Sequence, residues 1–251
     1  MRQFRRLFDE AEHLYACLDR PRRALQRIER ALRLKPDDPD ALVLKGRILF
    51  RLDRVRESWN CYGRALALDR GCSQAYLGRA SILYGLVEDN KRALQEVSKA
   101  LRYAGRDRWE RFEALRLRGH VLSALDRERE ALRYYRAALK LRPKDPEILW
   151  NLGQSLLLEN KPKRALRYLE KALRILNDQE HPDKVDLGLV IGSKTEALNA
   201  LGKHTEALKI VEDGIKHVRT TPLIEELRNL RDQTRVVLYN RSSAVGRRTR
   251  Q

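Results

Sequence analysis

The sequence contains little cysteine, few aromatic residues and no long hydrophobic run. Its 251 residues include three cysteines, Cys17, Cys61 and Cys72, with no CxxC spacing. This odd number indicates neither a disulfide framework nor a zinc site, and it favours a reducing compartment. No segment approaches the roughly 20 apolar residues of a membrane helix, and the basic N-terminus turns acidic before any apolar core of a secretory signal could form. We therefore expect a soluble, cytoplasmic protein with no membrane span.

The residue patterns of common catalytic and metal sites are missing as well. The five histidines are scattered, with no HxxxH or HExxH spacing and no His/Cys cluster. The sequence has no glycine-rich phosphate loop and no GxSxG motif. Acidic pairs such as Asp37–Asp38 are expected to cap the next helix. These absences predict that the protein is not an enzyme and that it has no cofactor and no metal site.

Positive charge is in clear excess. The chain has 53 Lys and Arg against 35 Asp and Glu, a formal net charge of +18, and 39 of the 53 cations are Arg. Such a field attracts anionic partners, and Arg favours bidentate pairing with carboxylate or phosphate, although a compositional bias gives the same excess. Hydrophobic residues make up 42% of the chain, which is enough to bury a core.

One helical phrase occurs six times, as in "RALQRIERAL" and "RALRYLEKAL". Each copy has a small residue, and a second one seven places later. The pairs are Ala24 and Ala31, Ser58 and Ala65, Ala93 and Ala100, Ala131 and Ala138, Ala165 and Ala172, and Ala207 and Gly214. Small residues two turns apart on one helical face allow a neighbouring helix to approach closely.

Another helix is expected before each phrase, with a small residue of its own in every copy except the first, where Glu12 takes that position. The small residues are Gly46, Ala80, Gly119, Gly153 and Thr195. Between the two helices stand residues that tolerate the left-handed conformation with which many helices end. They are Asp19, Asp53, Asp126, Asn160 and Gly202. Pro36 and Pro143 are expected to close the second helix of their copies.

This pattern resembles the tetratricopeptide repeat family, whose unit is a pair of antiparallel helices. The resemblance is carried by "LWNLG" at residues 149–153, the paired small residues and the two prolines. It implies an all-α fold, a right-handed superhelical α-solenoid of six helix pairs within a single domain, 1–240. The expected repeats are 5–38, 39–72, 73–107, 108–145, 146–179 and 180–221, followed by a capping helix, 222–239, and a basic disordered tail, 240–251.

The resemblance also implies a concave surface lined by the first helix of each repeat, where a peptide segment of a partner protein would bind. The groove residues expected in this register are Arg47, Phe50, Arg51, Gln74, Leu77, Tyr84, Arg116, His120, Trp150, Asn151, Gln154, Leu157 and Asn199. Aromatic side chains beside Arg and amide donors are typical of binding hot spots. Trp150 is the first choice for the anchor, because it is displaced by one residue from the family's usual buried aromatic position. The alternative is that Trp150 only packs against the next repeat.

The carboxylate clamp of the chaperone-binding family members is matched only in part, by Arg116, His120 and Asn151. Leu189 and Ser193 stand where further cations are required. We therefore do not expect binding to the C-terminal tails of heat-shock chaperones.

A nucleic-acid-associated module is the alternative function. A column of residues along the second helices is mostly basic: Arg33, Arg102, Lys140, Arg174 and Lys216. Regularly spaced cations could follow a phosphate backbone. Against this, no aromatic residues are expected to interleave with the stripe for base stacking. A third hypothesis is that two copies of the chain associate through their end helices. We expect the protein to be a monomer or a weak homodimer.

Overall fold

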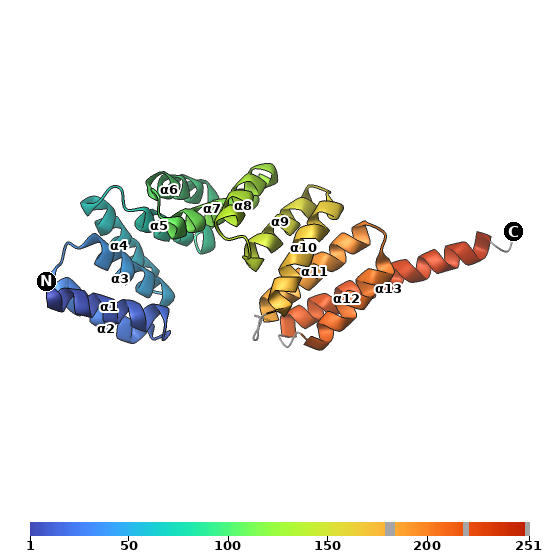
Figure 1. Cartoon of the computed structure of the whole chain (residues 1–251), viewed down its shortest axis with the longest axis horizontal. Helices are drawn as coiled ribbons and strands as arrows, with labels where there is room; N and C mark the ends of the chain where they lie inside the picture. The colour runs from blue at the N-terminus through green and yellow to red at the C-terminus, as the bar shows by residue number, and fades with distance from the viewer. Residues whose placement is uncertain (179–183, 218–220, 249–251) are drawn as a thin grey trace. The chain divides into compact units, whose positions relative to one another are not determined.

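The structure, a computed structural model, is built of helices. It describes residues 1–178, 184–217 and 221–248, and within these ranges there are helices and no strands. The helices α1 to α7 are Arg2–Ala16, Pro21–Leu34, Pro39–Arg51, Val55–Leu68, Ser73–Gly85, Asn90–Tyr103 and Arg108–Ser123. The helices α8 to α13 are Glu128–Leu141, Pro146–Leu158, Pro162–Asn177, Lys184–Ala200, His204–His217 and Thr221–Arg248. Within the units, α1 pairs with α2, α3 with α4, α5 with α6, α9 with α10 and α11 with α12, as the repeats predict. The expected all-α solenoid of helix pairs is thus confirmed (Figure 1).

The chain forms two compact units, Met1–Asp126 with helices α1 to α7 and Arg127–Gln251 with helices α8 to α13. The sequence predicted a single domain, whereas the boundary falls in the turn of the predicted repeat 108–145. Each repeat of a solenoid packs only on its neighbours, so no single core has to hold the stack together. The two units are therefore described separately.

The small residues of the repeated phrase lie at helix contacts, as predicted. Ala24, Ala93, Ala131, Ala165 and Ala207 are fully buried. Ser58, which takes the same position in α4, is also fully buried, and its hydroxyl donates a hydrogen bond to the carbonyl oxygen of Gly46, 2.7 Å away in α3. The hydroxyl thus satisfies its own hydrogen-bonding need while keeping the two helices close.

The turns between paired helices have the predicted left-handed backbone. Asp19, Asp53, Asp126, Asn160 and Gly202 all have φ between 44° and 75°. In the third repeat, which has one extra residue, the corresponding residue is Glu88 with φ 56°. The predicted helix ends are also observed, since α2 and α8 end two residues before Pro36 and Pro143. The predicted cap is formed by Asp38, whose carboxylate accepts a hydrogen bond from the Ala41 backbone N–H at 3.0 Å.

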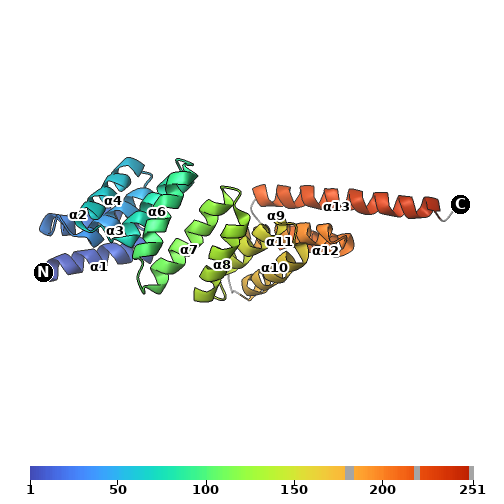
Figure 2. The same cartoon turned by 90° about the horizontal axis from the view of Figure 1, so that it is seen from above.

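The last helix is longer than the sequence indicated. A capping helix was expected over 222–239, but α13 runs from Thr221 to Arg248, so most of the expected disordered tail is helical (Figure 2). Residues 240–248 contain no proline and a single glycine, so nothing in the covalent chemistry ends the helix there. Residues 249–251 lie outside the described ranges, as do 179–183 at the junction of the fifth and sixth predicted repeats and 218–220 near the end of the sixth.

Candidate functional site

The first unit has a cleft built from its first helices. The cleft encloses about 310 Å³ and is lined by Tyr15, Arg47, Phe50, Tyr62, Gln74, Leu77, Gly78, Ser81, Trp109, Glu113, Arg116 and Leu117. Apart from Tyr62, these residues come from α1, α3, α5 and α7. The structure therefore brings together Arg47, Phe50, Gln74, Leu77 and Arg116 of the predicted groove.

Aromatic side chains in this cleft remain exposed. Phe50 is 37% exposed and Trp109 is 42% exposed, although both are large and apolar. The guanidinium of Arg47 lies 5.3 Å from the centre of the Tyr15 ring and 5.7 Å from that of Trp109. These cation–π contacts hold Arg47 between α1 and α7. The cleft thus offers accessible aromatic surface beside an oriented guanidinium.

The polar side chains at the far end of the cleft are held by hydrogen bonds. Arg116 Nη2 donates to Glu113 Oε2 at 2.7 Å, and Gln74 Nε2 donates to Glu110 Oε1 at 3.0 Å. Gln74 lies on α5 and Glu110 on α7, so their bond joins two lining helices. Fixed side chains lose less conformational entropy when a ligand binds.

Trp109, Tyr15 and Glu113 were missed by the sequence analysis. Trp109 lies at the start of the predicted repeat 108–145, which is four residues longer than the predicted repeats 39–72 and 146–179. The structure places the start of this repeat in α7, which has 16 residues where α3, α5 and α9 have 13. The extra length therefore extends the helix toward the cleft, and a tryptophan at the start of a lengthened repeat was the available signal.

Three groove predictions in the first unit lie outside the cleft lining. Arg51 pairs with Asp19, with Nη2 3.3 Å from Oδ1. The Tyr84 ring packs near that of His120, with 6.3 Å between ring centres. Burial, together with the charge of Arg116, lowers the pKa of His120 to about 4, so its imidazole is neutral at pH 7. These three residues support the helices beside the cleft.

Trp150 does not serve as an exposed anchor in the structure. Its indole Nε1 donates to Ser193 Oγ at 2.8 Å, and its ring is partly buried against the core of the second unit. The prediction that Trp150 turns toward the groove as the main anchor is therefore corrected: it joins α9 to α11. A displacement of one residue on a helix rotates a side chain by about 100°, and here that rotation points the indole at the next helix pair.

The remaining groove predictions lie in the second unit. Asn199 donates from Nδ2 to Thr234 Oγ1 at 2.8 Å, and its Oδ1 lies 3.0 Å from His204 Nδ1, so it connects α11 to α13. Asn199, predicted to line the groove, is half-buried and bonded to α13. Asn151 and Leu157 are half-buried. Gln154 lines a second cavity of about 320 Å³ with Glu196 and residues of α11 and α13, and burial raises the pKa of Glu196.

All five cations of the predicted anionic-partner stripe are exposed. Arg33 and Arg102 belong to the first unit, and Lys140, Arg174 and Lys216 to the second. Lys216 is paired with Asp213, with 3.1 Å between Nζ and Oδ1. One aromatic residue does accompany the stripe, contrary to expectation: Tyr103, beside Arg102, is 43% exposed and stacks on Tyr76. A single stacked pair is a small platform for bases.

No helix in the described ranges is both long and apolar enough to cross a membrane. In the same part of the chain, no group of three or more His, Cys, Asp or Glu residues is placed to hold a metal ion.

Known proteins share the repeat and the fold. The tetratricopeptide repeat model matches residues 8–58 and 116–180. The human protein O-mannosyl-transferase TMTC1 is 25% identical over 167 residues, covering 66% of this chain and 19% of that protein. The Saccharomyces cerevisiae anaphase-promoting complex subunit CDC16 is 27% identical over 154 residues, covering 59% of this chain and 17% of that protein. The chain thus spans about a fifth of the length of these curated relatives.

Two solved structures show the same fold. PilW, described as a type IV pilus biogenesis factor, superposes with a TM-score of 0.76 at 17% identity, over 90% of this chain and 97% of that one. YrrB, described as a repeat protein of this family with an unusual peptide-binding site, superposes with a TM-score of 0.62 at 20% identity, over 80% and 97%. The matched family model and the repeated helix pairs identify tetratricopeptide repeats in this chain, and the two solved structures share its fold.

Proposed function

We propose that this protein is a non-enzymatic interaction scaffold that binds a peptide segment of a partner protein in the cleft of its first unit. The observation that carries the proposal is the exposure of Phe50 and Trp109 in a concave site beside Arg47 and Arg116. Tryptophan and arginine are enriched at binding hot spots, and aromatic surface left accessible in a cleft is stabilised when a ligand covers it.

The lining of the cleft supports a peptide with an apolar and an acidic side chain. Phe50, Trp109 and Leu77 favour an apolar side chain at its centre, and the guanidinium of Arg47 favours a carboxylate nearby. A peptide-binding site in YrrB, a protein of the same fold, supports the use of this fold for peptide capture.

The three cysteines are free thiols, of which Cys17 is exposed, and this supports a reducing, cytoplasmic setting.

The proposal is tested with a peptide selected from a random display library on the full chain. The double variant Phe50→Ala with Trp109→Ala is expected to weaken binding of that peptide by about a hundredfold, the effect of losing roughly 3 kcal/mol of aromatic contact. The matched control is Leu34→Ala with Leu68→Ala, two exposed apolar residues of the same unit that do not line the cleft. Equal binding by both variants would reject the cleft as the binding surface.

The nucleic-acid alternative makes a different prediction for the same protein. Reversal of Arg33, Arg102, Lys140 and Arg174 to Glu would abolish salt-dependent RNA or DNA binding. That variant would leave peptide capture unchanged under our proposal.

A further inference from the structure

A small cavity in the second unit has a strongly cationic lining. It encloses about 260 Å³ and is lined by Arg136 of α8, Leu156 of α9, and Arg164, Arg167, Tyr168 and Lys171 of α10. Four of these six side chains are positively charged and none is negatively charged. The cavity shares no residue with the cleft of the first unit.

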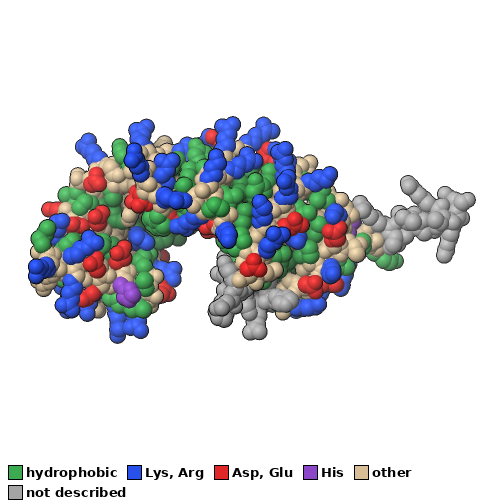
Figure 3. Space-filling view, in the orientation of Figure 1, with side chains coloured by type: hydrophobic (Ala, Val, Ile, Leu, Met, Phe, Trp, Pro, Cys, Tyr) green, Lys and Arg blue, Asp and Glu red, His purple; other side chains and the backbone are tan. Residues whose placement is uncertain are grey.

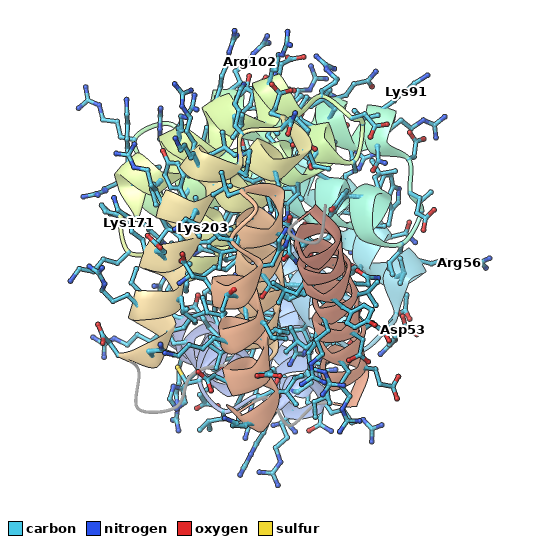
Figure 4. The ribbon with its side chains drawn as sticks, turned by 90° about the vertical axis from the view of Figure 1, so that its right-hand side faces the viewer. Asp53, Arg56, Lys91, Arg102, Lys171 and Lys203 are labelled. Atoms are coloured by element: carbon cyan, nitrogen blue, oxygen red, sulfur yellow. The ribbon has the colours of Figure 1, made fainter. Side chains whose placement is uncertain are left out.

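The register of α10 explains why the cations meet. Arg164, Arg167, Tyr168 and Lys171 follow one another at intervals of three, one and three residues, which places them on one face of a helix. The three cationic side chains are exposed, Tyr168 is half-buried, and Leu156 is fully buried. Lys171 points outward from the ribbon in Figure 4. The cavity therefore has an apolar base and a charged rim that reaches solvent.

The four cavity cations gather in one place with no carboxylate among the lining residues. Elsewhere a basic residue is often paired three residues away, as in Arg54 with Glu57 and Arg127 with Glu130. None of the four cavity cations forms an ion pair within the part of the chain that the structure describes. Glu170, the single carboxylate of α10, does not line the cavity.

Like charges at these helical spacings repel one another, and side chains of Lys and Arg crowd the surface over α8 and α10 (Figure 3). The arrangement thus produces a concentrated positive potential in a concave site. An anion entering the cavity would relieve that repulsion.

We propose that this cavity binds a small polyphosphate, a ligand with two or more linked phosphate groups. Arg136, Arg164 and Arg167 can each donate two parallel hydrogen bonds to phosphate oxygens, Lys171 adds a point charge, and the Tyr168 hydroxyl adds a donor. A cavity near the lower limit of about 300 Å³ for small-molecule sites suits a compact ligand, and a lining with a single aliphatic side chain does not suit an apolar one.

Isothermal titration of the full chain with inorganic diphosphate and triphosphate tests the proposal. We expect one ligand per chain, and affinity reduced by about tenfold or more in the variant Arg164→Gln with Arg167→Gln. The matched control is Arg133→Gln with Lys163→Gln, two exposed cations of the same helices that lie outside the cavity. The control removes the same charge and is expected to change affinity by less than about twofold.

Two results would overturn this assignment. Equal weakening in the two variants would mean that the overall positive field attracts the ligand. Absence of diphosphate and triphosphate binding at low salt would also overturn it, and a single-stranded RNA oligonucleotide that then bound only the intact cavity would identify a nucleic-acid site instead. Because all four substituted residues are exposed, the circular dichroism of the variants should match that of the original chain. Peptide capture in the first unit should be unchanged throughout.

Discussion

The side chain of Tyr62 is enclosed between two glycines of neighbouring helices. It is 2% exposed, and a Cβ added to Gly46 would lie 2.6 Å from its Cε1. A Cβ added to Gly78 would overlap the same ring. The sequence indicated Gly46 as a point of close approach, but it gave no reason to single out Gly78. The close approach at Gly78 arises because the side chain of α4 that fills the space between the glycines is Tyr62, and a repeat pattern does not specify which side chain does so.

Substitution Gly78→Ala should therefore destabilise the first unit. Overpacking against a buried ring costs about 1–3 kcal/mol, which exceeds the gain of about 0.5–1 kcal/mol from replacing a helical glycine. The control is Gly63→Ala in α4, where no atom lies within 4 Å of an added Cβ, so a small gain is expected there. Urea unfolding of both variants measures the difference. A Gly78→Ala variant as stable as Gly63→Ala would refute the close packing around Tyr62.

His120 should make stability depend on pH. Burial and the Arg116 charge lower its pKa to about 4 from the ordinary 6.5, so the unfolded chain takes up the proton first as the pH falls. This stabilising contribution is complete above pH 6.5 and is lost toward pH 4. Between pH 7 and pH 5 the free energy of unfolding should fall by about 2 kcal/mol through this group.

The variant His120→Gln is expected to remove that part of the pH dependence and to leave the contribution of the carboxylates. Urea unfolding at pH 7 and pH 5 is the measurement. The same slope in the variant as in the original chain would show that His120 is not responsible.

At the scale of the element, the turns between paired helices show how much of the backbone conformation a repeat pattern can predict. Four of the residues with positive φ are Asp or Asn and were predicted from their fixed offset. Glu88 stands at the same offset, five residues before Ala93, and takes the same conformation without a side chain suited to it. Non-glycine residues other than Asn and Asp are uncommon in this region.

The substitution Glu88→Gly should consequently stabilise the α5–α6 pair. Relief of left-handed strain, about 1–2 kcal/mol, outweighs the added flexibility of glycine and leaves roughly 0.5–1 kcal/mol. Asp126→Gly is the comparison, with a smaller gain because Asp tolerates this conformation. Thermal melting of both variants checks the order. A loss of stability on Glu88→Gly would contradict the assigned backbone conformation.

The sequence could not predict the lengths of two helices, α7 and α13. Both exceed the repeat template, α7 through the residues around Trp109 and α13 through its extension to Arg248. Periodicity identifies which residues face a neighbouring helix. It cannot say whether inserted residues continue a helix or form a loop, because that depends on contacts with the adjacent repeat.

At the scale of the whole molecule, the repeat predicted the fold class and the pairing of helices within each unit. The division into two units was not predicted, because each helix pair looks alike in the sequence. Trp150 and Asn199 were assigned to an open groove, but the structure uses both to join helices of the second unit. Repeat register places a side chain on a face, while the neighbouring helices decide whether it remains accessible.

The three tryptophans provide the most direct test of the proposed function, since they report on different places. Trp109 lines the cleft, Trp59 lies in the same unit outside that cleft, and Trp150 is in the second unit. We would label the full chain with 5-fluorotryptophan, assign the three fluorine resonances by single substitutions, and add the selected peptide. The account predicts that the Trp109 resonance shifts while those of Trp59 and Trp150 stay in place. A shift of Trp150 with none of Trp109 would contradict it.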